Sequence, residues 1–515
     1  MADNLRTFAT PCSGGLVVNQ DPLTQGGQMA GSAIRLINYE PALNGGYRRI
    51  SGYTNAYGEV PGLANTAVLG VHVSADIGDG IFATRKPTTG NNYLHAWNNS
   101  TTSWDTITTV GTTNMTGVSQ VRFESFNWGA PKFAMVDGVN PASTWNGTAY
   151  VQLSGGSSPS APSIVAAFNN HLFLSGDSSE PYNLYFSAPV DETDWTPSSG
   201  AGVINVGYQI TQLKSFRNEL YIFGKNNIKR LVGNNIADFQ LITVTANLGC
   251  VAPDSVVEFN GDILFLAPDG IRPVTGTDKI GDIELATLSK PIQSIFEDYT
   301  ANEDLASMTT VVIKKKSQFR LFFANQDSLG IIGAIRRSGQ SGAGFEYSQL
   351  VGIAVNCAHS GYIGDEEFVI HGDSSGYVYR QEVGDNFNNN DIFSLFQTPF
   401  FYMDDPAVRK SFYDIDTYMR SEGEVTVAMA LEYDYGDPTV TIGSDYSLST
   451  RGAAAFYDKA TYDSTDIYDG NPSPVESTSI SGSGKSISIR YVANDQKPSH
   501  TIQAITLTYG LGDRR

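Results

Sequence analysis

The sequence predicts an all-β protein that combines a β-propeller with an additional β-sandwich-like platform domain. Most apolar residues fall in runs of four to six, rich in Val, Ile, Phe and Tyr and bounded by Gly, Asn, Asp and Pro, which is typical of strands and hairpins. One hairpin pattern recurs along the chain. After about residue 386 the runs become longer and alternate between polar and apolar residues. These three observations predict the fold class.

Residues 261–276, GDILFLAPDGIRPVTG, illustrate the recurring hairpin. Residues 263–266 are predicted to form one strand and residues 271–274 the returning strand. Between them, Pro268-Asp269-Gly270 forms the turn, because Asp-Gly readily supplies the positive φ that a tight turn needs.

The hairpin recurs at a spacing that favours propeller blades. Its landmarks are Leu172, Leu220, Ile263, Leu321 and Phe368. They lie 48, 43, 58 and 47 residues apart, and runs at 80–83 and 132–136 extend the series toward the N-terminus. Repeats of about 40 to 50 residues are typical of blades, because one four-stranded sheet cannot bury both faces and must stack against neighbours around an axis. Unrelated hairpins in one or two β-sandwiches are the alternative.

Three regions are therefore predicted. Residues 63–385 form the propeller. Residues 1–62, with many Gly, Pro and Asn and weak periodicity, form a segment that wraps the platform or a neighbour; its most distinctive part, GGYRRI at 45–50, places two arginines in an acidic chain. Residues 386–515 form a C-terminal β-rich platform, because alternation with one polar face implies sheets that are half exposed to solvent.

Two segments depart from this pattern of strands. Ile292, Ile295, Phe296 and Tyr299 follow helical spacing, and Ser289 can cap the first turn, so a single short helix is expected over 289–299. Residues 446–484 are rich in Ser, Gly, Asp and Tyr and are predicted to form a long exposed excursion.

Composition argues against several classes of function. Lys and Arg number 33 against 53 Asp and Glu, which gives a formal net charge of −20, and no basic stretch is dense enough to form an arm. Holding nucleic acid by neutralising its phosphates requires clustered Lys and Arg, so we expect no such binding. Charged residues make up only 17% of the chain, against roughly 25% in an average domain, which fits short strands joined by polar turns.

Secretion and membrane insertion are both disfavoured. The N-terminus, MADNLRTFATPCSGG, has neither a basic region followed by an apolar run nor a small-residue cleavage site, and no segment approaches 18 apolar residues. Cys12, Cys250 and Cys357 are odd in number and far apart, which favours reduced, buried thiols over a disulfide framework. We expect a protein that is folded in a cytosol and has no membrane span.

No pattern indicates catalysis or a bound cofactor. None of the histidines lies in HExxH or beside spaced cysteines. GDSSG at 372–376 matches GxSxG by letter, but a predicted strand follows it where a nucleophile elbow needs a helix. The sequence therefore predicts no enzyme, no catalytic, cofactor-binding or metal-binding residue, and no cofactor. The six histidines are His72, His95, His171, His359, His371 and His500.

Acidic residues leave one enzymatic alternative open. Asp76 and Asp79 resemble part of a calcium loop, but the alternating ligands and the closing glutamate are missing, which favours a solvated turn. Glycoside hydrolysis needs only two suitably spaced carboxylates, and Asp404-Asp405 or Asp414 with Asp416 could supply them. The latter pair shares one face of a strand, which is more typical of a wet sheet surface.

All five tryptophans precede residue 200, in the predicted first blades. Exposed indoles could line a sugar-binding surface, whereas buried ones would fill propeller cores or subunit contacts, and the second interpretation is favoured. The five are Trp97, Trp104, Trp128, Trp145 and Trp195.

Four segments resemble the tail nozzle proteins of short-tailed bacteriophages, the group that includes tail tubular protein B and the packaged-DNA stabilisation proteins. They are INYEPALNGGYRRISGY at 37–53, LYFSAPVDETDW at 184–195, ITVTANLGCVAPDSVVEFNGDILFLAPDGIRPV at 242–274 and GKSISIRYVANDQKPSHTIQAITLTYGLGDRR from residue 484. Together they cover about a quarter of the chain, spread from end to end. The inserted domains of larger nozzles are not found in this chain.

The resemblance implies a structural virion protein that forms the nozzle ring of a phage tail, closes the DNA channel until ejection and conducts DNA on opening. It implies six copies in a ring, attachment to a tail adaptor ring bound to the portal, contact with tail fibres, and assembly in the host cytoplasm. DNA would pass without specific binding, because a wall of negative potential repels phosphates. The alternative is a receptor-binding tail protein that recognises host surface glycans.

Overall fold

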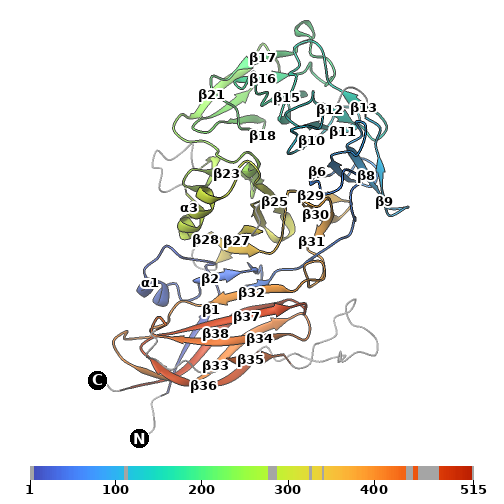
Figure 1. Cartoon of the computed structure of the whole chain (residues 1–515). Coiled ribbons are helices and arrows are strands. Elements are labelled where there is room, and N and C mark those ends of the chain that lie inside the picture. Colours follow the sequence, from blue (N-terminus) through green and yellow to red (C-terminus); the bar gives the residue numbers. More distant parts are fainter. Residues whose placement is uncertain are drawn as a thin grey trace.

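The computed structural model describes residues 5–109, 114–275, 287–323, 328–338, 342–436, 445–450 and 475–512. The chain is nearly all β, as the sequence predicts. Figure 1 shows many small sheets in the upper part of the molecule and two sheets of longer strands layered in the lower part. No helix in these residues is long and apolar enough to span a membrane.

The first four small sheets each contain four consecutive antiparallel strands. Sheet 1 is β6 (Val68–Val73), β7 (Ile81–Arg85), β8 (Leu94–Asn98) and β9 (Ser103–Thr106); sheet 2 is β10 (Arg122–Asn127), β11 (Pro131–Val136), β12 (Ser143–Trp145) and β13 (Tyr150–Gln152). Sheet 3 is β14 (Ile164–Phe168), β15 (His171–Ser175), β16 (Asn183–Phe186) and β17 (Gly202–Asn205); sheet 4 is β18 (Gln212–Phe216), β19 (Glu219–Phe223), β20 (Ile228–Val232) and β21 (Gln240–Thr245).

The last three small sheets are less uniform, since sheet 5 has three strands and sheet 7 takes its fourth from the N-terminal region. Sheet 5 is β22 (Val257–Phe259), β23 (Asp262–Ala267) and β24 (Gly270–Pro273); sheet 6 is β25 (Thr309–Ile313), β26 (Gln318–Phe322), β27 (Leu329–Ser338) and β28 (Gly342–Val351). Sheet 7 is β29 (Cys357–Ile363), β30 (Glu366–Gly372), β31 (Val378–Gln381) and β5 (Tyr53–Thr54).

Separate hydrophobic cores join each small sheet to the next. Six of these cores link sheets 1 to 7 in sequence order, and a further one packs Val68 and Val71 of sheet 1 against Ile370 and Val378 of sheet 7. The row of sheets therefore returns to its start, and β29 lies against β6. The seven cores lie around Phe133, Leu172, Leu220, Phe265, Phe319, Phe322 and Val71.

The recurring hairpin of the sequence is the second strand of each small sheet. All seven landmark runs lie in β7, β11, β15, β19, β23, β26 or β30. In sheets 3, 4 and 5 a two-residue turn precedes this strand, and both turn residues have positive φ, as in Asn169 (44°) and Asn170 (63°). Such turns match the twist of the flanking strands, which explains the recurring Asn in this position.

The first 54 residues contribute strands to several parts of the molecule. β5 pairs with β31 and completes sheet 7, while β2 lies between β28, with which it is parallel, and β32, with which it is antiparallel. β1 and β4 both pair with β38 near the other end of the chain. These elements are β1 (Arg6–Pro11), α1 (Pro22–Gly27), β2 (Arg35–Ile37), β3 (Tyr39–Pro41) and β4 (Tyr47–Arg49).

The lower part consists of two large sheets that share one core. Insertion of β2 makes sheet 6 continuous with β32, β37, β34 and β35, so that nine strands form a single sheet, and the other large sheet has the order β3-β4-β38-β33-β36. Met429 and Ile489 of the first face Ile415 and Ile505 of the second in the shared core. The strands are β32 (Ile392–Gln397), β33 (Lys410–Ser421), β34 (Thr426–Tyr433), β35 (Tyr446–Ser449), β36 (Val475–Gly484), β37 (Ile487–Asp495) and β38 (His500–Leu511).

Two local predictions need correction. The expected helix is present as α3 (Gln293–Asn302), but it starts after a 3-10 turn, and Ser289 accepts a hydrogen bond from the Ile271 amide instead of capping it. α1 is a second helix that the sequence did not lead us to expect.

The predicted excursion over residues 446–484 begins and ends in strands, β35 and β36. Residues 451–474 between them lie outside the described residues. The 3-10 turns are Pro197–Ser199, Pro253–Ser255, Lys290–Ile292 and Lys314–Lys316.

Closure of sheet 7 by β5 leads to a stability prediction. The Tyr53 ring packs against His371, Tyr379 and Phe387 at centroid distances of 5.0, 5.3 and 5.2 Å. We expect Tyr53→Ala to lower the free energy of unfolding by about 3 kcal/mol, because it removes an aromatic anchor and leaves a cavity. Urea unfolding measures the change, with Tyr182→Ala, at a side chain that is 50% exposed, as the control. Equal stability of the two variants would contradict the role given to β5.

Candidate functional site

The first strands of all seven small sheets surround a cavity of about 220 Å³. A second cavity of about 460 Å³ shares Lys214, Val257, Thr310 and His359 with it, so the two form one axial space. One lining residue from each sheet is Val71, Glu124, Ala166, Lys214, Val257, Thr310 and His359.

An ion pair crosses the axial space from sheet 2 to the turn before sheet 5. Arg122 Nε and Nη2 donate to Asp254 Oδ1 and Oδ2, both at 2.8 Å, and Nη1 donates to the Ser163 carbonyl at 3.0 Å. Gln120 Nε2 also donates to Asp254 at 2.8 Å. Burial alone would lower the pKa of Arg122, but Asp254 raises it above the ordinary value, so the guanidinium stays charged. This bidentate pair ties together sheets that are not neighbours.

Burial shifts the pKa values of two other ionisable groups on the axis in the direction that favours their neutral forms. Burial raises the pKa of Glu124, and the nearby Lys214 ammonium offsets part of that rise. Burial, followed by Lys214, lowers the pKa of His359 to about 4. His359 Nδ1 accepts a hydrogen bond from the Val73 amide at 3.1 Å, which leaves Nε2 to carry the ring proton. The described residues contain no cluster of three or more His, Cys, Asp or Glu side chains able to hold a metal ion.

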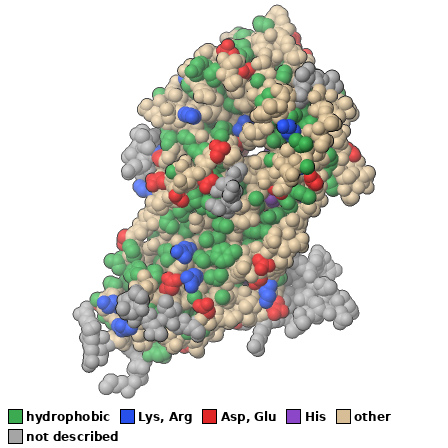
Figure 2. Space-filling view, in the orientation of Figure 1, with side chains coloured by type: hydrophobic (Ala, Val, Ile, Leu, Met, Phe, Trp, Pro, Cys, Tyr) green, Lys and Arg blue, Asp and Glu red, His purple; other side chains and the backbone are tan. Residues whose placement is uncertain are grey.

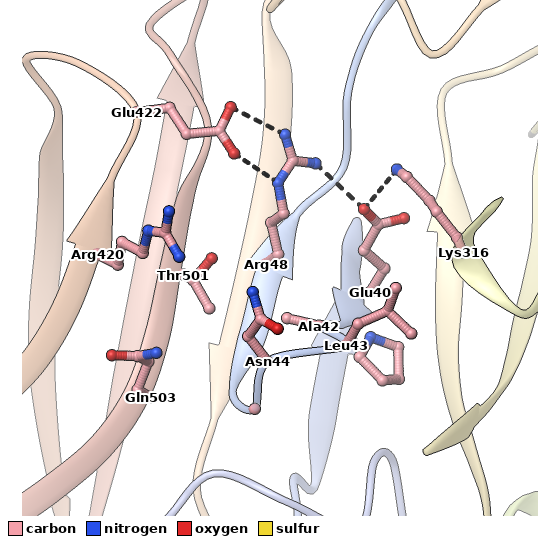
Figure 3. A pocket seen from close by; sticks show the side chains of 12 residues that line it. Glu40, Ala42, Leu43, Asn44, Arg48, Lys316, Arg420, Glu422, Thr501 and Gln503 are labelled. Carbon is pink, nitrogen blue, oxygen red and sulfur yellow. Dashed lines mark hydrogen bonds and ion pairs between the residues drawn. The ribbon is translucent and has the colours of Figure 1, made fainter. Parts of the chain in front are cut away.

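A second polar site lies where the upper and lower parts of the molecule meet. Glu40 of β3 is only 3% exposed, and its carboxylate contacts Arg48 at 3.1 Å, Lys316 at 2.6 Å and Arg320 at 3.1 Å. Arg48 also donates to both carboxylate oxygens of Glu422, at 2.8 and 3.0 Å (Figure 3). Burial would raise the pKa of Glu40, but the three cations lower it to about 2. We call these five residues the junction cluster.

Arg49 and Tyr39 form a parallel connection to the C-terminal strands. Arg49 Nη1 contacts Asp495 Oδ1 and donates to the Lys497 carbonyl, both at 2.8 Å. The Tyr39 hydroxyl lies 2.7 Å from Nε2 of His500, whose pKa burial lowers to about 3. Both arginines of the 45–50 segment are therefore used inside the molecule, one toward Glu422 and one toward Asp495.

The residues considered from the sequence do not come together as an active site. GDSSG at 372–376 is the turn between β30 and β31, as expected. Asp414 and Asp416 lie on the outer side of β33 and accept hydrogen bonds from Ser479 and Ser477. Asp404 pairs with Arg6. The three cysteines are buried and unpaired.

The tryptophans and histidines serve mainly as packing groups. Trp104 and Trp195 are buried, and the other three indoles are half-buried. Trp97 and Trp104 lie 5.4 Å apart at their ring centroids, and Tyr57 packs against both. Five of the six histidines are buried by accessible area, and His359 lies half-buried in the axial space.

Sequence reasoning missed the most important polar contacts. Nothing in the sequence indicated that Glu40 would be buried. Arg48 and Arg49, which lie on the paired strand β4, did stand out in an acidic chain. Arg122 and Asp254 lie 132 positions apart, and a single sequence carries no information about such a pairing.

No model of a protein family and no curated protein matches the chain. Among solved structures, the extracellular domain of a hybrid two-component system from B. thetaiotaomicron matches with a TM-score of 0.41 and 11% identity over 67% of this chain and 41% of that one. KlHsv2 with loop 6CD replaced by a Gly-Ser linker matches with a TM-score of 0.30 and 9% identity over 54% of this chain and 81% of that one. The chain spans about two fifths of the first structure, and similarities this low carry no argument about function.

The junction cluster predicts a large cost for losing its carboxylate. We expect Glu40→Gln to lower the free energy of unfolding by about 3 kcal/mol, because it removes the buried carboxylate that three cations share. Glu422 still pairs with Arg48, and Glu382 still pairs with Lys316 and Arg320, so the loss stays at the lower end of the range for a broken buried ion pair. Glu366→Gln is the matched control, since Glu366 pairs with Arg380 but its side chain is 58% exposed, and we expect a loss below about 1 kcal/mol. Chemical denaturation at pH 7 compares the two, and similar losses would contradict the structural role of Glu40.

The burial of neutral histidines predicts that the folded protein loses stability in acid. Burial lowers the pKa of His371 to about 3 in the folded protein, against about 6.5 in an unfolded chain. The contribution of His371 to the free energy of unfolding is complete above pH 6.5. It is lost as the pH falls toward 3, because only the unfolded chain then binds a proton at this ring. Unfolding of His371→Gln and of the unchanged protein at pH 7, 6 and 5 should give a slope that is shallower in the variant by about 1.4 kcal/mol per pH unit below 6.5. Identical slopes would show that His371 is not held neutral.

Proposed function

We propose that sheets 1 to 7 are the blades of a seven-bladed β-propeller spanning residues 63–385. Residues 386–515 form the platform domain, and residues 1–62 wrap along both. Support comes from the seven separate cores between consecutive sheets, including the one that joins sheet 7 to sheet 1. Pairing of β5 with β31 also supports the proposal. This strand from the N-terminal segment completes sheet 7 and covers an edge that would otherwise be open.

We further propose that the protein is a structural virion protein, the nozzle of a phage tail, and not an enzyme. The observation that carries this proposal is that two of the nozzle-like segments meet in the structure. Residues 37–53 supply Glu40, Arg48 and Arg49, and the closing segment supplies Asp495 and β38, which pairs with β4. The resemblance thus falls on the junction between the proposed propeller and platform, which the buried ion pairs hold in a fixed arrangement.

The proposed DNA channel lies between copies of the chain, not along the axis of one copy. The axial cavity of about 220 Å³ is far too small for a duplex, and the Arg122–Asp254 pair crosses it. A ring of six copies would enclose a bore of its own. On the face seen in Figure 2, Lys and Arg side chains are scattered among Asp and Glu, and together with the net charge of −20 this favours a wall on which a duplex slides.

The alternative, a receptor-binding protein for host glycans, would need exposed stacking surfaces. None of the five tryptophans is fully exposed, and Trp97 and Trp104 are committed to packing with Tyr57. The indoles therefore give this alternative no support.

Electron microscopy of the purified full chain tests the nozzle proposal directly. We expect a ring of six copies with a central pore wide enough for duplex DNA. A trimer without a pore would favour the fibre-like receptor-binding alternative. A monomer that cleaves polysaccharide would favour an enzyme and overturn the proposal.

A further inference from the structure

A groove of about 260 Å³ lies beside the junction cluster, on the surface between propeller and platform. Its walls are the β3–β4 hairpin, the end of β33 and the start of β38, and Lys316 closes the side toward sheet 6 (Figure 3). The residues used below are Leu43, Asn44, Arg420, Thr501 and Gln503.

Several polar side chains in the groove lack partners within the described part of the chain. The Arg420 guanidinium makes no hydrogen bond or ion pair there, and the side-chain amides of Asn44 and Gln503 are also unbonded. Thr501 is only 7% exposed, yet its hydroxyl has no hydrogen-bond partner among these residues. Figure 3 shows Arg420, Thr501 and Gln503 on the wall formed by β33 and β38, with Asn44 facing them from the β3–β4 hairpin. Polar groups that converge in this way without bonding one another suit a ligand that brings its own acceptors.

The charged side chains in the groove favour a negatively charged ligand. Arg48 already contacts the carboxylates of Glu40 and Glu422, and Lys316 contacts Glu40. Arg420 is therefore the cation left to bind a carboxylate from outside. On the rim, Leu43 is 60% exposed, the largest exposed fraction among the large apolar side chains of the described residues. Arginine is enriched among interface anchors, and the exposed leucine beside it offers apolar area that a partner can bury.

We infer that this groove binds an acidic side chain of a second copy of this chain, with an adjoining apolar residue seated on Leu43. The inference rests on the proposed ring and names one of its contacts. A second copy suits the groove by charge, because Asp and Glu outnumber Lys and Arg by 53 to 33.

The positive charge of Arg420 also limits how two copies can meet. If two grooves faced each other across a two-fold axis, Arg420 of each copy would approach its equivalent, and like charges repel. The groove therefore meets a different, acidic surface of the neighbour, as it would in a head-to-tail contact. Repeated head-to-tail contacts close into rings when the rotation allows it.

Charge reversal at Arg420 tests the inference by native mass spectrometry and mass photometry of the full chain across a dilution series. We expect Arg420→Glu and Leu43→Asp to weaken ring assembly by about tenfold to a hundredfold in the dissociation constant, the range seen for interface anchors. Arg420→Lys, which keeps the charge, should retain most of the affinity. Arg409→Glu is the matched control, because Arg409 is an exposed arginine that already bonds Ser483, and it should change assembly by less than about threefold.

Circular dichroism of each variant, and thermal melting at concentrations where the chain is monomeric, show that the chain is folded. Arg420 and Leu43 are both exposed, so the melting temperature of the monomer should be unchanged. Rings that form equally well with Arg420→Glu and Leu43→Asp would overturn the groove contact while leaving the nozzle proposal intact. An unaltered chain that stays monomeric at every concentration would overturn both.

Discussion

The buried carboxylate of Glu40 holds the two parts of the molecule together. It lies at 3% exposure among Arg48, Lys316 and Arg320, which come from β4, the turn after β25, and β26. An ion of this kind is stable in a low-dielectric site only when several opposite charges surround it, so each partner must stay in position for the others to remain favourable. Arg48 extends the set to Glu422 at the end of β33, and one charge system thus spans the upper and lower parts of the molecule.

The small sheets depend on a different constraint, which is that no single sheet can bury both faces. Each core between consecutive sheets is separate, so that loss of one contact weakens the adjoining sheets without disrupting the others directly. The Arg122–Asp254 pair adds a tie across the axis between sheets that share no core. Sheet 6 has a second role, because β2 extends it into the nine-stranded sheet of the lower part.

Local patterns in the sequence predicted much of the fold. The hairpin landmarks from Leu172 to Phe368 are all second strands, because their spacing reflects short-range hydrophobic pattern and turn chemistry. The strand character of β35 and β36 escaped prediction, since these strands depend on pairing with β34 and β33. The short helix α1 carried a local signal that was overlooked, because Asp21 caps its first turn and Pro22 follows. The candidate sites were predicted far less well. Only the unusual pair Arg48-Arg49 was visible in advance, whereas the burial of Glu40 and the reach from Arg122 to Asp254 arise from contacts between distant segments that propensity does not encode.

Threading of the N-terminal strands through the rest of the molecule constrains how the chain can fold during synthesis. β5 pairs near residue 380, β2 lies between strands near residues 349 and 397, and β1 pairs with residues 504–509. The edges of β5, β2 and β1 therefore stay unpaired until the residues near 380, near 397 and at 504–509 have been synthesised. Contacts of such sequence separation slow folding and expose aggregation-prone edges. Completion of the fold is consequently late, because three separate sheets each need a strand from the N-terminal region.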